Sequence, residues 1–138
     1  MMAMNRNKSA YIAFGFIAAI AFESTCPPSL PNDVFSNLDK MAHFFAFGFV
    51  AWFVATALVH QKKNESWGFV VIVSFLLTSL LAIGNEWIQS FNPNRVVSLG
   101  DILAGMSGAA SFALAWRVMT MRKLQKNNAV RYLARKSL

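Results

Sequence analysis

Two long stretches without a charged residue limit what this chain can fold into. They cover residues 41–59 and 67–84, and their few polar side chains are one histidine and some serines and threonines. A helix rises about 1.5 Å per residue, so each stretch is long enough, or nearly so, to cross a hydrocarbon layer about 30 Å thick. We therefore predict two membrane-spanning helices in the middle of the chain.

Two shorter apolar stretches flank them, at residues 10–22 and 102–116. A helix this short still spans a bilayer when residues at its ends reach the headgroups or the bilayer thins around it. Only 14% of the residues are charged, whereas soluble domains carry about 25%. We predict an all-α fold, an integral membrane four-helix bundle. It forms one domain, residues 1–138, with spans at about 9–24, 40–59, 67–88 and 100–119 and a basic tail at 120–138.

The basic residues predict how the chain is oriented. If the N-terminus is cytoplasmic, eleven of the thirteen Lys and Arg residues fall on the cytoplasmic side, and only Lys40 and Arg95 lie outside. Lysine and arginine are enriched in cytoplasmic loops, so both termini are predicted to be cytoplasmic. A cleaved signal peptide at the first stretch is the alternative, and it leaves the orientation of the rest unchanged. The net charge of +7 follows from topology, and we predict no nucleic-acid partner.

The C-terminal tail is the most basic part of the chain. Seven basic residues follow from Arg117 onwards. We interpret the tail as an orientation anchor with a frayed end. The alternative is a contact with anionic membrane lipids, in which each basic residue contributes about 1 kcal/mol near the surface.

Small residues recur at helical spacing in the fourth stretch. Ala104 with Gly108, and Gly105 with Ala109, are each four residues apart, which lets two helix backbones approach closely. This spacing favours packing against a neighbouring span, and a homodimer through this helix is the alternative. The chain has no phosphate loop and no Cys or His cluster with zinc spacing, so we predict neither a metal nor another cofactor.

Ionisable residues collect where three of the predicted spans meet the outer surface. Lys40 and His43 are three residues apart near the start of the second span, and Glu86 and Gln89 are three apart near the end of the third. Residues at this spacing share one face of a helix. A charge within a bilayer costs at least about 2.5 kcal/mol and is tolerated where it faces the bundle interior and finds partners. Both pairs are therefore predicted to face inwards.

The start of the fourth span adds further polar residues to this group. Ser98 and Asp101 match a capping box, in which each side chain accepts a hydrogen bond from a backbone N–H at the helix start. From depth and spacing we predict one outward-facing polar pocket. Its predicted lining residues are Lys40, His43, Glu86, Gln89, Arg95 and Asp101.

The segments LDKMAHFFAFGFVAWF and NEWIQSFNPNRVVSLGDILAGMSG resemble the VanZ-like family of small bacterial membrane proteins. The matching residues are Lys40, His43, Glu86, Gln89, Pro93, Arg95, Ser98, Asp101 and Gly108. This chain departs from the family at Gly105, where an Asn is common, so an activity that needs that amide is not implied. The resemblance implies a multi-pass protein of the bacterial cytoplasmic membrane. Through the family's namesake it also implies a link to resistance against the glycopeptide teicoplanin.

Three accounts of the polar residues remain open. In the structural account they bond one another and hold the bundle together, as polar side chains in membranes do at about 0.6–2 kcal/mol per bond. In the binding account they hold a lipid headgroup, a lipid-linked cell-wall precursor or a glycopeptide, with Arg95 and Lys40 gripping phosphate or carboxylate. In the enzyme account, Glu86 or His43 acts as acid or base on an outer-leaflet substrate. The sequence shows no obvious nucleophile, so we do not favour an enzyme.

Overall fold

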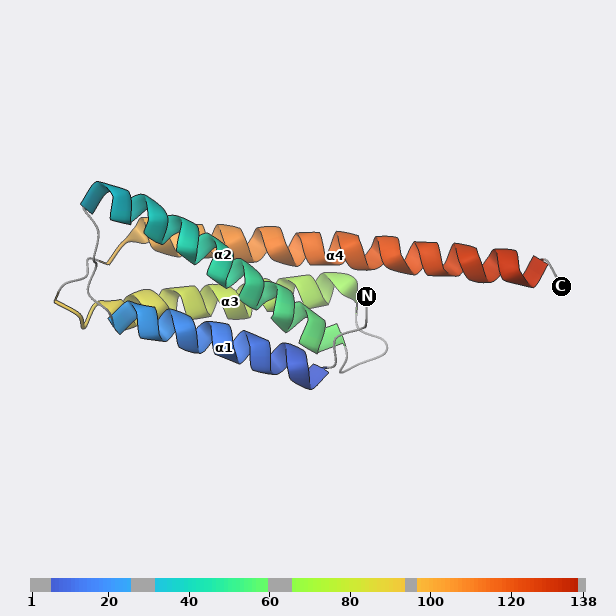
Figure 1. Ribbon diagram of the computed structural model, residues 1–138, viewed down its shortest axis with the longest axis horizontal. Coiled ribbons are helices and arrows are strands. Elements are labelled where there is room, and N and C mark those ends of the chain that lie inside the picture. Colours follow the sequence, from blue (N-terminus) through green and yellow to red (C-terminus); the bar gives the residue numbers. More distant parts are fainter. Residues whose placement is uncertain (1–5, 26–31, 60–65, 94–96, 137–138) are drawn as a thin grey trace.

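The computed structural model describes residues 6–25, 32–59, 66–93 and 97–136 of the 138. Within these ranges the chain forms four α-helices that lie side by side (Figure 1). They are α1 (Arg6–Thr25), α2 (Asn32–Val59), α3 (Trp67–Gln89) and α4 (Leu99–Lys136). The prediction of an all-α bundle of four helices is confirmed.

Three of these helices are long and apolar enough to cross a membrane. The candidate spans are Asn37–Val59, Trp67–Gln89 and Leu99–Leu133. The first two agree closely with the predicted spans, and the membrane class is confirmed. The helix α1 does not meet the same criterion, although its 20 residues reach about 30 Å. A fourth span therefore stays a prediction.

Two helix ends differ from the sequence-based expectation. The second span was predicted from about residue 40, whereas α2 begins at Asn32. No Gly or Pro lies between Asn32 and the apolar stretch, so the helix continues ahead of the apolar pattern.

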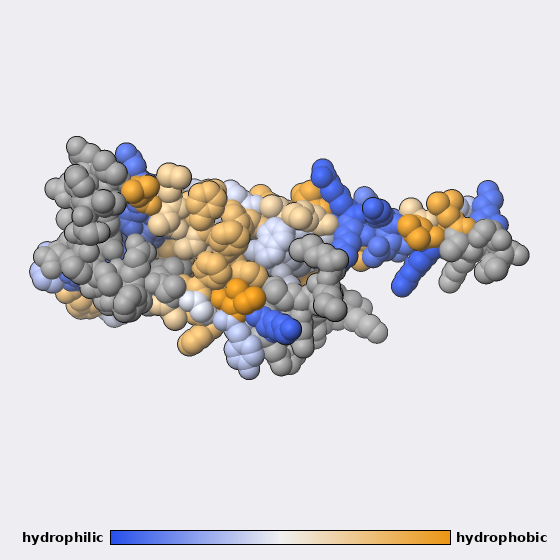
Figure 2. Space-filling view, in the orientation of Figure 1, coloured by the Kyte–Doolittle hydropathy of each residue, from blue (hydrophilic) through white to orange (hydrophobic). Residues whose placement is uncertain are grey.

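The tail was expected to fray, but α4 runs without a break to Lys136. No Gly or Pro follows Gly108, and good helix formers such as Ala, Leu, Lys and Arg continue the helix beyond the apolar segment. Figure 1 shows the second half of α4 projecting past the other three helices. Figure 2 shows many hydrophilic and some hydrophobic residues on this projection, whereas the coloured surface of the bundle is mainly apolar.

The bundle core consists of small clusters spaced along its axis. Phe47, Val50 and Ala82 form the cluster nearest the N-terminal end of α2. Ala51 packs with Ala109 in the next cluster along the axis. The third cluster contains Ala55, Val70 and Trp116. Because α2 contributes to all three clusters, it is the central helix of the bundle.

The contact between α2 and α4 is the most extensive in the bundle. A Cβ added to Gly108 would overlap the backbone carbonyl of Phe44, so only glycine allows this approach. A Cβ at Gly105 would lie 2.8 Å from the Phe47 ring and 3.1 Å from Ala82. Ala109 is fully buried and Ala104 is half-buried. The glycine face thus packs within the chain, and a homodimer through α4 stays a prediction that requires another face of this helix.

Candidate functional site

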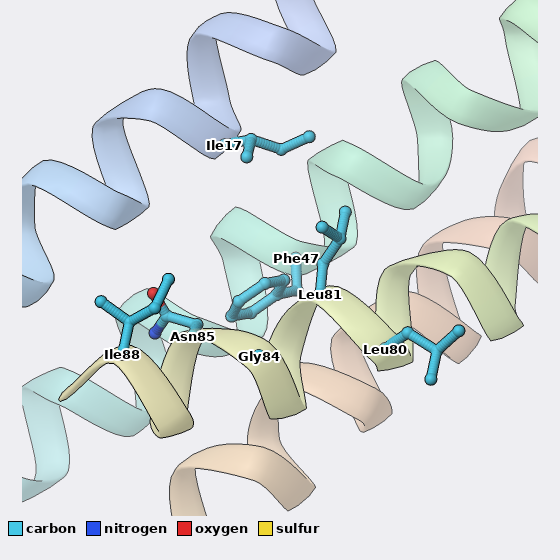
Figure 3. Close-up of a pocket in the computed structure, with 7 residues that line it drawn as sticks. All are labelled: Ile17, Phe47, Leu80, Leu81, Gly84, Asn85 and Ile88. Carbon is cyan, nitrogen blue, oxygen red and sulfur yellow. The ribbon is translucent and has the colours of Figure 1, made fainter. Parts of the chain in front are cut away.

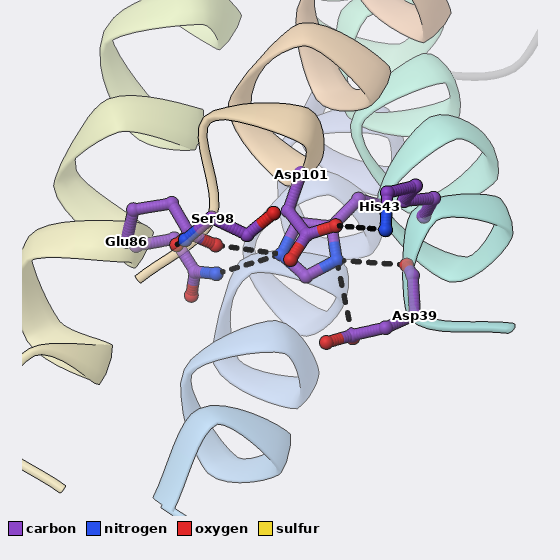
Figure 4. Close-up of polar contacts among 7 residues, drawn as sticks. Asp39, His43, Glu86, Ser98 and Asp101 are labelled. Atoms are coloured by element: carbon purple, nitrogen blue, oxygen red, sulfur yellow. Dashed lines mark hydrogen bonds and ion pairs between the residues drawn. The ribbon is translucent and has the colours of Figure 1, made fainter. Parts of the chain in front are cut away.

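Polar side chains are buried together at one end of the bundle, where α2 begins, α3 ends and α4 begins. Figure 4 shows how side chains from these three helices converge. The buried polar residues at this end are Asp39, His43, Asn85, Glu86, Gln89 and Asp101. We call these six residues, with Lys40 and Ser98, the polar network.

The imidazole of His43 is the centre of the polar network. It is only 3% exposed. Its Nδ1 lies 2.9 Å from the backbone oxygen of Asp39 and 3.4 Å from a carboxylate oxygen of the same residue. Its Nε2 lies 3.2 Å from Asn85 Nδ2 and 3.5 Å from Glu86 Oε1. Both ring nitrogens are therefore engaged, and the ring joins α2 to α3.

The His43 ring fits two hydrogen-bonding arrangements. In the neutral ring, Nδ1–H donates to the Asp39 carbonyl and Nε2 accepts from the Asn85 amide. In the doubly protonated ring, Nε2–H donates to Glu86 Oε1. Neither arrangement leaves a ring nitrogen pointing into open space, as a general base acting on an external substrate would need. The geometry therefore gives little support to His43 as a catalytic base.

Glu86 fixes the start of α4. It is 1% exposed, and its Oε2 accepts a hydrogen bond from the backbone N–H of Ser98 at 3.0 Å. Ser98 immediately precedes α4, as a cap residue would. A capping box would give this N–H to Asp101, whereas here a carboxylate from α3 accepts it. A negative charge at a helix N-terminus is favourable, so this bond ties α3 to α4.

Lys40 forms the exposed edge of the polar network. Its Nζ lies 3.8 Å from Asp101 Oδ1, and the Lys40 side chain is 39% exposed whereas that of Asp101 is 6% exposed. The stem of Lys40 crosses the first turn of α4, because a Cβ added to Gly100 would lie 2.9 Å from Lys40 Cε. The lysine thus lies over the carboxylate at the exposed edge of the bundle.

Some carboxylate oxygens of the polar network have no hydrogen-bond donor among the described residues. Glu86 Oε1 and Asp101 Oδ1 are buried and accept no hydrogen bond from the described residues. Buried polar atoms in native proteins nearly always have such a partner, so each exception calls for an explanation. Among the described residues, no three His, Cys, Asp or Glu side chains are arranged to hold a metal ion. The arrangement suits a ligand that supplies O–H or N–H donors.

Most of the predicted pocket residues lie at this end of the bundle. Lys40, His43, Glu86 and Asp101 are linked through the contacts given above, and Gln89 is buried beside them. Arg95 lies outside the described residues.

Sequence analysis missed two members of the network, Asp39 and Asn85. Asp39 is four residues before His43, a spacing that places both on one helix face, and this signal was available. Asn85 directly precedes Glu86, and adjacent residues do not share a face. Asn85 is four residues before Gln89, so the same spacing rule places it on the inward face, but its contact with His43 depends on how α2 and α3 pack.

Comparison with known proteins finds a family match. The family described as VanZ/LLP1 matches residues 1–120, which is most of the chain and includes the whole polar network. No curated protein and no solved structure matches this chain.

Proposed function

The chain belongs to the VanZ/LLP1 family, and we propose that this small membrane protein binds the headgroup of an envelope amphiphile at its polar network. Three apolar helices, α2 to α4, support its place as a multi-pass membrane protein. The headgroup is one that donates hydrogen bonds through hydroxyl or amine groups. Lipids, lipid-linked cell-wall precursors and glycopeptides all include such molecules.

The observation that carries this proposal is that two buried carboxylate oxygens, Glu86 Oε1 and Asp101 Oδ1, accept no hydrogen bond from the residues that the structure describes. A buried carboxylate is stable only when other groups compensate its lost hydration. Lys40 at 3.8 Å from Asp101 is a distant partner for such a group. An ammonium or hydroxyl group of a ligand would supply the missing donors, and Lys40 would then face the ligand's phosphate.

A structural role is the second candidate, and the hydrogen bond from Ser98 to Glu86 favours it. This bond and the His43 contacts join three helices without any ligand. The two roles are compatible for Glu86, whose two oxygens differ: Oε2 holds α4, whereas Oε1 lies 3.5 Å from His43 Nε2 and accepts no hydrogen bond from the neutral ring. The two roles make different demands on Asp101: the binding role requires its carboxylate, and the structural role requires it less.

The donor requirement can be tested with two lipids of equal net charge, one with N–H donors in its headgroup and one without. Phosphatidylethanolamine carries three N–H donors in its headgroup, whereas phosphatidylcholine has the same net charge and none. Native mass spectrometry of the purified protein should show preferential retention of phosphatidylethanolamine when both lipids have identical chains. An added glycopeptide or lipid-linked precursor that occupies the same site should displace it.

The matched variants are Asp101→Asn in the polar network and Thr56→Val at the opposite end of the bundle. We expect Asp101→Asn to lower the preference for phosphatidylethanolamine about tenfold, since one charge-assisted bond contributes about 1.5–3 kcal/mol. Thr56→Val should keep the preference. If wild type retains both lipids equally, the protein does not recognise headgroup donors and the proposal fails.

We further propose that the polar network faces the outside of the bacterial cytoplasmic membrane, with both termini inside. The basic projection of α4 lies at the opposite end of the bundle from the polar network, as lysine and arginine bias requires (Figure 1). In a Cys26→Ser background, a membrane-impermeant maleimide added to intact cells should label Phe91→Cys. It should label Lys126→Cys only after lysis. The reverse pattern would invert the orientation.

A further inference from the structure

An apolar groove opens beside the polar network. Its volume is about 150 Å³, and it lies between α1, α2 and α3. Figure 3 shows Ile17 of α1 facing Phe47 of α2 and Leu81 of α3 across it. Leu80, Gly84 and Ile88 complete its apolar lining. Leu80 and Ile88 are also exposed on the outer surface of the bundle, so the groove is open to the lipid around a membrane-spanning helix.

The groove and the polar network share one residue, Asn85. Its side chain lines the groove, and its Nδ2 lies 3.2 Å from His43 Nε2. From Leu80 to Ile88 the lining follows α3 for about 12 Å towards the polar end. A molecule lying in the groove therefore contacts Asn85, through which the groove adjoins His43.

We infer that this groove holds one acyl chain of a membrane lipid whose donor headgroup occupies the polar network. The inference rests on the proposed function and adds the second half of the ligand. Hydrocarbon chains are the medium that surrounds α3 within a membrane, and a void of about 150 Å³ takes up a molecule of about six carbons. The groove has room for a side chain at Gly84, because an added Cβ there would meet nothing within 4 Å.

The groove orients the bound lipid more than it adds to the binding free energy. Lipid tails are as apolar as leucine side chains, so moving a chain from the bilayer into the groove gains van der Waals packing and little else. Its main effect is to orient the lipid so that the headgroup reaches the carboxylates. The protein then selects its lipid by the headgroup and by the acyl chain together.

Filling the groove tests this inference. Gly84→Leu places a side chain in the slot, and Gly15→Leu on α1 is its matched control, because an added Cβ there also meets nothing within 4 Å. Both changes replace a helical glycine, so both raise helix propensity equally. The probe is phosphatidylethanolamine with a photoreactive diazirine on one acyl chain, in nanodiscs of phosphatidylcholine.

In wild type and in Gly15→Leu, the diazirine should crosslink to α3 around Leu81 and Ile88 and to α1 around Ile17. Gly84→Leu should lower these crosslinks and the retained phosphatidylethanolamine about fivefold, since the added side chain occupies the volume of a chain segment. Unchanged crosslinking in Gly84→Leu would overturn the groove inference.

Asp101→Asn separates this inference from the proposed function. If Gly84→Leu binds as wild type does while Asp101→Asn loses the donor preference, the groove inference falls and the headgroup proposal stands. If Gly84→Leu loses the lipid while Asp101→Asn keeps its preference for phosphatidylethanolamine, the coupling of chain and headgroup is wrong. If Gly84→Leu unfolds, Leu81→Trp fills the same groove from the neighbouring position on α3.

Discussion

The two ends of the bundle are both joined by polar contacts, but in different ways. At the end where α2 finishes, Trp116 Nε1–H donates to Thr56 Oγ1 at 3.0 Å, and the Thr56 hydroxyl donates to the Trp52 carbonyl at 2.9 Å. These bonds join neutral donors to neutral acceptors. At the polar network, buried carboxylate oxygens of Glu86 and Asp101 accept no hydrogen bond from the described residues.

This difference shows what a purely structural tie requires. An indole and a hydroxyl suffice to join α2 to α4, and their neighbours Ala55 and Val70 are small and apolar. Buried charges are a costlier means to the same end, because their desolvation must be offset by partners. We therefore propose that a ligand supplies donors to the carboxylate oxygens that have none among the described residues.

The largest loss of stability should come from a substitution that lies between the two ends of the bundle and disrupts both. Gly108→Ala would force α2 and α4 apart, because the added Cβ overlaps the Phe44 carbonyl. We expect a loss of about 3 kcal/mol, the upper part of the range for overpacking. Unfolding by dodecyl sulfate in mixed micelles measures it. Gly84→Ala is the control, since its Cβ meets nothing, and equal stability of the two variants would contradict the packing account.

A smaller loss should distinguish the two oxygens of Glu86. Glu86→Leu leaves the Ser98 N–H without its acceptor, which costs about 2 kcal/mol for a buried donor. Glu86→Gln keeps an acceptor oxygen in that place and should cost less than about 1 kcal/mol. The same unfolding titration compares them. If both variants are equally unstable, the charge itself holds the bundle and the polar network is structural.

The smallest loss of stability should come from a substitution at the end of the bundle opposite the polar network. Thr56→Val removes the acceptor of the Trp116 N–H, and side-chain bonds within membranes are worth about 1 kcal/mol. Stability should fall by about this amount, with phosphatidylethanolamine retention unchanged in native mass spectrometry. A change in lipid retention would show that the two ends are not independent.

Much of the fold could be predicted from the sequence, because hydropathy decides it. The span at Trp67–Gln89 differs from the predicted 67–88 by one residue, and α4 starts one residue before its predicted start. The extension of α4 to Lys136 was missed, because the apolar stretch ends near Trp116 whereas residues of high helix propensity continue beyond it. The sequence also gave no signal for the groove, which depends on where Ile17 packs.

The polar network was predictable only where the spacing of residues along a single helix determines which side chains face inwards. Spacing along α2 and α3 placed His43 and Glu86 on inward faces, and the same rule applied to Asp39 would have added it. The bond from Ser98 to Glu86 connects residues 12 positions apart across a turn. It depends on the angle between α3 and α4, which no pattern of spacing encodes.

The most direct test of the central claim is the stabilisation of delipidated protein by phosphatidylethanolamine. A ligand at 100 times its Kd stabilises the folded state by about 2.7 kcal/mol, so the unfolding midpoint rises. We predict the same rise for wild type and Thr56→Val, and little or none for Asp101→Asn. An equal rise in all three, or the same rise with phosphatidylcholine, would contradict the claim that buried carboxylates receive a donor headgroup.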